Sequence, residues 1–406
     1  MLNTTFSSWP AYTEEEADAV RTLLLSNRVN YWTGSECQLF EEDFAAWSGV
    51  DYAVALMNGT VALDVALKAL DIGVGDEVIV TSRTFIASAS CIVLAGATPV
   101  FADVDENSQN ITAETIRPLL SRQTKAIICV HLAGWPCDMD PIMDLAREQN
   151  IYVIEDCAQA HGAIYKGRSV GSIGHIGAWS FCQDKIMTTS GEGGMVTTND
   201  PALWSRMWSY KDHGKSREAV LKSKSTLEFN WVHDNFGTNW RMTEIQAVIG
   251  RIQLKRMKEW HAKRLSNAQR IWSVAEELPG LRVPEIPHHS EHAAYKCYVF
   301  VIPEQLAVGW NRHGILTAIR ERGVPCYIGS CSEVYLEKAF DNTSYRPSER
   351  LTVARRLGET SLMFLVHPTL TSAEIDKTTR VLRDVMFMAT ARVQSRQKLS
   401  CEMAIS

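Results

Sequence analysis

The sequence lacks the features of a membrane-spanning, secreted or nucleic-acid-binding protein. No apolar run in its 406 residues is long enough to cross a bilayer. The first twenty residues include Glu14, Glu15, Glu16 and Asp18 and no apolar core, so they do not resemble a signal peptide. The basic residues form no block, and the formal net charge is -6. We therefore expect neither a membrane nor a nucleic acid as a partner.

The ten cysteines show no disulfide or metal-binding pattern. None belongs to a C-x-x-C pair, and several, such as Cys91 and Cys129, lie in apolar runs. Buried reduced thiols in a cytoplasmic protein explain this distribution. The stretch "HHSEH" (288–292) has Pro284 and Pro287 beside it, which favours a solvated loop, and we predict no metal site.

The glycines do not form the usual phosphate-binding patterns. In "SFCQDKIMTTSGEGG" (180–194), Lys185 precedes the glycines, whereas a P-loop places its lysine after them. Gly171, Gly174 and Gly177 are spaced three apart, so the G-x-G-x-x-G fingerprint of a nicotinamide dehydrogenase is absent. These glycines alone do not say whether Lys185 is an ordinary surface lysine or holds a cofactor.

Strand and helix patterns alternate through the first half of the chain. Several strand-like runs are apolar without alternation, as in strands covered on both faces. The expected strands are 52–57, 77–80, 98–104, 125–130, 151–156, 178–182 and 193–198, and the expected helices between the earlier ones are 61–70, 85–96, 113–120 and 139–150. This order predicts an α/β fold with a mostly parallel seven-stranded sheet flanked by helices.

The pattern changes near residue 241. Residues 242–278 are typical of one long helix, or two, ended by Pro279 and Gly280. A strand at 295–302 and helices at 314–323 and 373–386 follow. We expect two domains: a large α/β domain with an N-terminal arm over 1–240, and a linking helix with a smaller α+β domain over 241–406.

Two strand ends offer groups that bind charge. Asn58, Gly59 and Thr60 separate a strand from a helix, and free N–H groups at a helix start attract an anion. The alternative is that Thr60 merely caps the helix. Asp156 ends another strand, where a helix cap or a salt bridge is the simpler explanation. Gln159 follows it as a possible hydrogen-bond donor to a ring, and a small Ala158 leaves room for one.

Lys185 lies just past the expected strand 178–182, which contains Ser180. Most lysines are solvated, but one in a buried site attacks carbonyl groups. An anion site, a strand-end aspartate and a strand-end lysine supply the three contacts that pyridoxal phosphate needs. Its phosphate takes the helix start, its pyridine nitrogen the carboxylate and its aldehyde the amine.

The order of these residues resembles a known family. From about Tyr31 to about Met386, the chain is similar to the fold-type I pyridoxal-phosphate aminotransferases of the DegT/StrS type, which act on nucleotide-linked keto-sugars. The similar segments are "YWTGSECQLFEEDFAAW", "NGTVALDVALKALDIGVGDEVIV", "GATPVFADVD", "VHLAGWPCDMD", "IEDCAQAHGA", "SFCQDKIMTTSGEGGMVT", "GTNWRMTEIQAVIGRIQL" and "SLMFLVHPTL".

The resemblance implies a role for each catalytic position. Lys185 matches the lysine that binds the cofactor covalently and then moves the proton between the substrate carbon and the cofactor C4′. Asp156 matches the carboxylate that keeps the pyridine nitrogen protonated. Gln159 matches the residue that is hydrogen-bonded to the ring oxygen of the cofactor.

The resemblance also implies the remaining cofactor contacts. Gly59, Thr60 and Ser180 match the residues that surround the phosphate. Phe85 matches the aromatic ring that stacks on one face of the cofactor, with Ala158 against the other face.

Asn239 matches a residue that reaches the cofactor phosphate of a neighbouring subunit. The resemblance therefore implies a homodimer in which each site is built from two chains. Thr33 and Arg241 are hypothetical sugar or nucleotide contacts. In "KDHGKS" (211–216), Lys211 and Lys215 are either further phosphate contacts or part of a solvated loop.

The chain departs from the family pattern at two places. Asn58 stands where serine is usual before the Gly-Thr turn, which predicts a change in one phosphate contact. Ser82 and Arg83 stand where a proline-led turn is common, so the entry to Phe85 is expected to differ in shape. Relatives with histidine in place of the lysine behave as sugar dehydratases, and Lys185 argues against that reaction here.

The sequence thus predicts an aminotransferase that moves an amino group from an amino acid, by analogy L-glutamate, to a nucleotide-linked keto-sugar. We favour a 4-keto-6-deoxyhexose as the acceptor, with a C-3 keto-sugar as the alternative. The product would be an amino sugar for polysaccharide, glycan or secondary-metabolite biosynthesis. An alternative of another class is a non-catalytic regulator that binds the same cofactor.

Overall fold

The computed structural model describes residues 5–223 and 231–403. Its large sheet has seven strands in the order β1-β9-β8-β5-β4-β2-β3. They are β1 (Tyr52–Leu56), β2 (Glu77–Thr81), β3 (Thr98–Ala102), β4 (Thr124–Val130), β5 (Tyr152–Asp156), β8 (Ile176–Ser180) and β9 (Gly194–Thr198). Only β9 runs antiparallel to its neighbours, and every other pair is parallel. The predicted mostly parallel α/β sheet is confirmed.

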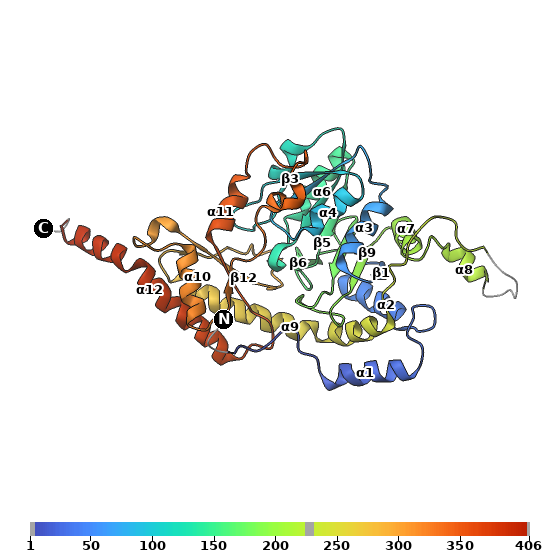
Figure 1. Ribbon diagram of the computed structural model, residues 1–406, viewed down its shortest axis with the longest axis horizontal. Helices are drawn as coiled ribbons and strands as arrows, with labels where there is room; N and C mark the ends of the chain where they lie inside the picture. Colours follow the sequence, from blue (N-terminus) through green and yellow to red (C-terminus); the bar gives the residue numbers. More distant parts are fainter. Residues whose placement is uncertain (1–4, 224–230, 404–406) are drawn as a thin grey trace.

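Helices cover both faces of this sheet (Figure 1). They include α1 (Glu14–Leu25), α2 (Glu36–Ser48), α3 (Gly59–Ala69), α4 (Ala87–Leu94), α5 (Ala113–Ile116), α6 (Met139–Gln149), α7 (Pro201–Lys211) and α9 (Glu244–Glu276). Val54 and Leu56 of β1 pack with residues of α3 and α7, whereas Ala53 and Ala55 pack with residues of α2 and α9. Because both faces are buried, the strand sequences are apolar without alternation.

A smaller antiparallel sheet follows, in the order β10-β12-β14-β13. Its strands are β10 (Leu281–Arg282), β12 (Cys297–Val301), β13 (Cys326–Tyr327) and β14 (Ser361–Phe364), and its helices are α10 (Arg312–Glu321), α11 (Thr352–Thr360) and α12 (Ser372–Met403). Helix α9 joins the two parts, because Ala247 and Leu254 belong to a core cluster of the large sheet and Ala268 and Ile271 to the core of the small one. Figure 1 shows α9 running beneath both. The exact division into 1–240 and 241–406 stays a prediction.

Several local predictions differ from the structure. Strand β8 ends at Ser180 rather than at residue 182, so Lys185 lies in a loop. Helix α12 continues to Met403, well beyond residue 386. The stretch 288–292 is not simply a solvated loop, because β11 (Ser290–Glu291) joins β6 (Ile164–Tyr165) and β7 (Arg168–Ser169) in a three-stranded sheet. His292, at its end, is 4% exposed.

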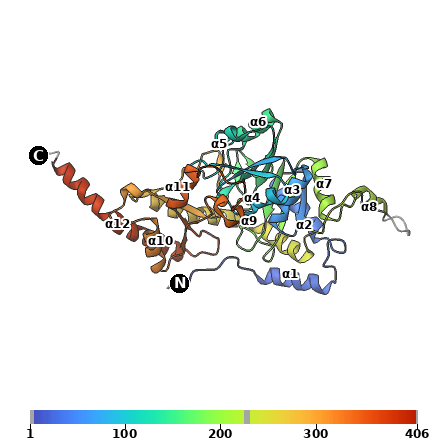
Figure 2. The ribbon, with the colours of Figure 1, turned by 45° about the horizontal axis from the view of Figure 1, so that its top comes forward.

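Two segments extend along or away from the body of the molecule. The N-terminal arm and α1 run below α9, and α8 (Arg217–Ser223) projects from the side of the large sheet (Figures 1 and 2). Phe6 of the arm packs against the core of the small sheet. In the part of the chain that the structure describes, no helix combines the length and apolar character needed to cross a membrane.

Candidate active site

A cavity of about 840 Å³ lies where the carboxyl ends of β5 and β8 meet the start of α3. This edge is where open α/β sheets bind their ligands. We call it the strand-end cavity. Eight of the nine residues predicted to contact the cofactor line it, namely Gly59, Thr60, Phe85, Asp156, Ala158, Gln159, Ser180 and Lys185. Residues separated by more than 120 positions in the sequence thus meet at one place.

The start of α3 is one end of this cavity. Asn58 caps the helix, since its side-chain oxygen accepts a hydrogen bond from the Val61 N–H at 3.0 Å. The interpretation of Thr60 as the cap is therefore wrong. The first-turn N–H groups of Gly59 and Thr60 have no acceptor within the helix, and both residues line the cavity. Together with the helix dipole, they form a site for an anion.

Gly59 is required where α3 meets β8. A Cβ atom at this position would lie 2.5 Å from the Ser180 Cβ and 2.9 Å from its Oγ. The close approach brings the Ser180 hydroxyl next to the helix start, so all three predicted phosphate contacts gather at this end.

Asp156 places a buried negative charge in the same cavity. Its side chain is held by neutral groups, because Oδ2 accepts from the Ser88 hydroxyl at 2.7 Å and Oδ1 from the Ala158 N–H at 3.1 Å. The residue is 6% exposed. It forms no salt bridge with any described residue, so the salt-bridge explanation is wrong. Ser88 was not predicted, because nothing in its sequence context distinguishes it from other helical serines.

Gln159 and Phe85 complete the sides of the cavity. The Gln159 Oε1 accepts from the Ala133 N–H at 2.9 Å, which leaves its NH₂ group as the donor toward the cavity. Phe85 is 66% exposed although it is aromatic, and with the half-buried Ala158 it leaves apolar surface uncovered. A flat ring suits a space with such a lining.

Lys185 is not an ordinary surface lysine. Its side chain is 16% exposed, and its Nζ lies 4.0 Å from Asp184 Oδ1 and 5.5 Å from the centre of the Tyr295 ring. The indole N–H of Trp9, in the N-terminal arm, donates to the Lys185 carbonyl oxygen at 2.7 Å. The arm and the small domain therefore fix the position of this loop and its amine.

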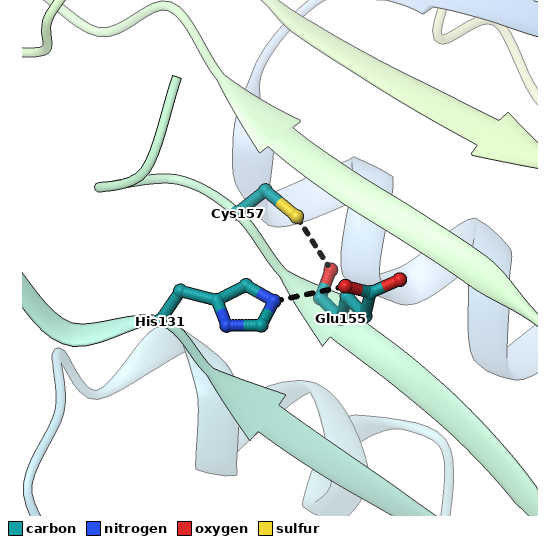
Figure 3. A group of neighbouring side chains, drawn as sticks. All are labelled: His131, Glu155 and Cys157. Atoms are coloured by element: carbon teal, nitrogen blue, oxygen red, sulfur yellow. Dashed lines mark hydrogen bonds and ion pairs between the residues drawn. The ribbon is translucent and has the colours of Figure 1, made fainter. Parts of the chain in front are cut away.

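A cluster of three buried side chains behind Asp156 has the composition of a metal site but is not one. His131, Glu155 and Cys157 lie close together (Figure 3). The His131 Nδ1 accepts from the Cys137 N–H at 2.9 Å, so its Nε2 carries the proton and donates to Glu155 at 3.0 Å. Neither ring nitrogen has a lone pair free for a metal.

The Glu155 carboxylate is also fully occupied. It accepts from the main-chain N–H groups of Gly171 at 2.8 Å, Ile173 at 2.8 Å and Gly174 at 2.6 Å. The Cys157 thiol points toward the Glu155 carbonyl oxygen (Figure 3). This cluster therefore joins β4, β5 and the loop before β8, and it fixes the strand end that positions Asp156.

Arg83 accounts for one departure from the family pattern. This fully buried guanidinium donates to Ser332 Oγ at 2.7 Å and to Gln109 Oε1 at 3.1 Å. The neighbouring residues Gly329, Ser330 and Cys331 line the strand-end cavity. Arg83 thus anchors the loop that forms one wall of the cavity, a role that no sequence pattern indicates.

Three predicted contacts do not line this chain's own cavity. Asn239 is exposed and pairs with Asp212, Arg241 is bound to the Asp212 carboxylate at 2.5 Å, and the Thr33 hydroxyl donates to Asn30 within a turn. Their roles stay predictions.

The hypothesis that Lys211 holds a phosphate is wrong. Its ammonium is completely buried and paired with Glu41 at 2.7 Å. The Lys215 ammonium is paired with Asp212 at 3.0 Å.

The donor set fits pyridoxal phosphate. Free N–H groups and a serine hydroxyl suit its phosphate, a carboxylate held by neutral donors suits its ring nitrogen, and a confined amine suits its aldehyde. All of them line one cavity, whose remaining volume extends toward the loop anchored by Arg83.

Comparisons with known proteins agree with this geometry. A model of the DegT/DnrJ/EryC1/StrS aminotransferase family matches residues 10–383. A solved aminotransferase structure from Psychrobacter cryohalolentis is 63% identical, covers 94% of this chain and 98% of that one, and superimposes with a TM-score of 0.92. A GDP-perosamine synthase from Caulobacter vibrioides is 37% identical over 350 residues, which are 86% of this chain and 89% of the relative. A UDP-N-acetyl-3-dehydro-alpha-D-glucosamine 3-aminotransferase from Acidithiobacillus ferrooxidans is 36% identical over 358 residues, 87% and 90% of the two chains. The family match includes the strands of all three sheets that the structure describes.

Proposed function

We propose that this chain, which belongs to the DegT/DnrJ/EryC1/StrS aminotransferase family, transfers an amino group from L-glutamate to a nucleotide-linked 4-keto-6-deoxyhexose. The protein is a pyridoxal-phosphate-dependent nucleotide-sugar aminotransferase. The observation that supports the proposal most is the placement of Lys185 and Asp156 in one cavity with the free start of α3. The free thiols among the described cysteines suit a reducing compartment, and we propose that the enzyme acts in the cytoplasm.

Each residue of the cavity then has a chemical task. Pyridoxal phosphate, when bound, supplies the electron-withdrawing ring on which the amino group is carried. The start of α3 and Ser180 would bind the phosphate, and the negative charge of Asp156 would favour a proton on the pyridine nitrogen. The Lys185 Nζ would hold the aldehyde end of the cofactor and would serve as the base for the proton on the α-carbon of the donor.

Gly59→Ala is expected to weaken cofactor binding about tenfold or more, because overpacking here forces α3 and Ser180 apart. Titration of the apoenzyme with pyridoxal phosphate, followed by absorbance, measures the change. Gly73→Ala is the matched control, since a Cβ there lies 3.6 Å from the nearest atom, the Ala95 oxygen. Equal affinities of the two variants would show that the phosphate does not bind at this helix start.

We also propose that the working unit is a homodimer with shared sites. Asn239 lies outside this chain's cavity, and nearby Phe236 is fully exposed. This segment follows α8, which projects from the body of the molecule (Figure 1). A second copy that covers this apolar side chain would bring Asn239 to its own cofactor phosphate.

Mixed dimers test the shared site. Lys185→Ala and Asn239→Asp each disable a different half of the same site, the second by placing a carboxylate against a phosphate. When the two variants are coexpressed with different tags and purified through both, one site of each dimer is intact, and about half of the wild-type activity is expected. A mixed dimer as inactive as either parent would contradict the shared site.

A panel of nucleotide-linked keto-sugars, with glutamate as donor and mass spectrometry of the products, tests the substrate. The expected result is an aminated product from a 4-keto-6-deoxyhexose. Turnover of C-3 keto-sugars alone would favour a C-3 keto-sugar as the acceptor. The similarity to a 3-aminotransferase supports this alternative. A regulator would leave glutamate unconverted.

A further inference from the structure

A second cavity of about 400 Å³ adjoins the strand-end cavity, and nothing in the proposed cofactor site uses it. We call it the arm cavity, because residues 5–9 of the N-terminal arm form one side. Arg264 of α9 and His367, just beyond β14, form others. The two cavities are neighbours, since Asp184, Tyr295, Lys296 and Leu365 line both of them.

Arg264 is a buried cation without a counter-ion in this cavity. Its side chain is 1% exposed, and its Nε and Nη2 have no hydrogen-bond acceptor among the described residues. Its guanidinium lies 4.8 Å from the centre of the Trp9 ring. Such stacking engages the face of the guanidinium but leaves its N–H edge unsatisfied. Burial lowers the pKa of Arg264 to about 9.

Lys296 adds a second cation. Its Nζ lies 4.6 Å from the centre of the Tyr295 ring, and it forms no ion pair with any described residue. Burial lowers its pKa to about 8, so the ammonium is still mostly charged at neutral pH. His367 adds no further positive charge, because burial lowers its pKa to about 3 and its ring is uncharged at neutral pH.

Asp184, the carboxylate that lines both cavities, does not pair with Arg264. Its Oδ2 accepts from the Tyr295 hydroxyl at 2.5 Å, its Oδ1 lies 4.0 Å from Lys185 Nζ, and its side chain is 61% exposed. A buried charge without a partner is strongly destabilising. An anion with two coplanar oxygens satisfies Nε–H and Nη2–H together, which is the geometry of a carboxylate.

We propose that the arm cavity binds a carboxylate of the amino-acid donor, with the Nε–H and Nη2–H edge of Arg264 as its main contact and the Lys296 ammonium as its second. The inference rests on the proposed use of an amino-acid donor. Because Lys296 and Asp184 line both cavities, a donor held here lies beside Lys185.

Binding of glutarate to the holoenzyme tests this site without any turnover, because glutarate has the carboxylates of the donor but no amino group. Calorimetry is expected to give a dissociation constant that rises about ten- to a hundredfold in Arg264→Met. Arg270→Met is the matched control, since Arg270 is on the same helix but is paired with Asp376 at the surface, and its affinity should equal that of the wild type. Lys296→Met should weaken glutarate binding by a smaller factor.

Kinetics separate the donor from the acceptor. In Arg264→Met the KM for glutamate should rise by the same factor as the glutarate constant, whereas the KM for the nucleotide-sugar should not change. Binding of UDP and GDP, measured in place of glutarate, tests whether the cavity instead holds the diphosphate of a nucleotide. If their binding weakens and that of glutarate does not, the cavity holds a diphosphate and the proposal is overturned.

The remaining outcomes are equally decisive. Arg264→Met should not lower the melting temperature, because it removes an unpaired buried charge. A lower melting temperature with unchanged glutarate affinity would mean that Arg264 only supports the arm. Absence of glutarate binding to the wild type would overturn the proposal as well. If Arg264→Met does not fold, Lys296→Met decides the question. Glutarate binding requires no amino sugar, so failure of the substrate panel leaves this result intact.

Discussion

The Lys185→Ala protein is expected to bind pyridoxal phosphate and to transfer no amino group. The start of α3, Ser180 and Asp156 remain in place and hold the cofactor by non-covalent contacts. The variant lacks the amine that lies 4.0 Å from Asp184 Oδ1 and 5.5 Å from the centre of the Tyr295 ring, and the proton on the donor carbon then loses its proposed base. The rate should fall at least about a thousandfold. Stopped-flow measurement of the reaction with glutamate reports it.

Lys68→Ala is the control for the loss of a lysine. Lys68 is exposed on α3, the helix whose start lines the cavity, and its removal should leave the rate unchanged. Turnover of Lys185→Ala at the wild-type rate would remove Lys185 from the mechanism. Loss of cofactor from Lys185→Ala would show that the covalent bond provides most of the binding.

Asp156→Asn is expected to lower the rate about a hundredfold or more while the protein keeps its fold. The substitution preserves the shape of the side chain and an oxygen for the Ser88 hydroxyl or the Ala158 N–H, but removes the negative charge. Without that charge, the ring nitrogen loses the partner that favours its proton, and the electron-withdrawing power of the cofactor falls. Single-turnover rates of both half-reactions measure the loss.

Ser88→Ala distinguishes charge from position. It keeps the Asp156 carboxylate but removes the hydrogen bond to Oδ2, so the rate should fall by about tenfold or less. An equal loss in Ser88→Ala and Asp156→Asn would mean that orientation, rather than charge, is what Asp156 contributes. A wild-type rate in Asp156→Asn would contradict its role.

The sequence was sufficient to predict the sheet and its reactive edge. Apolar runs such as 77–80 and 125–130 favour strands buried on both faces, and their parallel order places Asp156 and the loop of Lys185 beyond neighbouring strand ends. The boundaries were less certain. Strand β8 ends at Ser180 because Phe181 and Thr189 then bond within the loop, and no local pattern reveals such a pairing.

The sequence does not predict which charged side chains are buried. Arg83, Arg264 and Lys211 look like ordinary basic residues in the sequence, yet all three are buried, each for a different reason. Arg83 anchors a loop, Lys211 neutralises Glu41, and Arg264 faces a cavity. The groups around these side chains lie far away in the chain, so only the folded structure shows which cation has a partner.

The capping residue of α3 is likewise not predictable from the sequence, although the two candidates are only two positions apart. Both Asn58 and Thr60 are good capping residues, and the sequence alone does not choose between them. The structure chooses Asn58, because its oxygen reaches the Val61 N–H. Asn58, which stands in place of the more usual serine, uses only the Val61 N–H. The N–H groups of Gly59 and Thr60 therefore remain available to an anion.

Reduction of the holoenzyme with borohydride, followed by peptide mapping, tests the central claim most directly. The predicted result is a single phosphopyridoxyl label on Lys185, in the peptide that joins β8 to β9. A label on another lysine, or an unlabelled Lys185 in a protein that still transfers amino groups, would contradict the account.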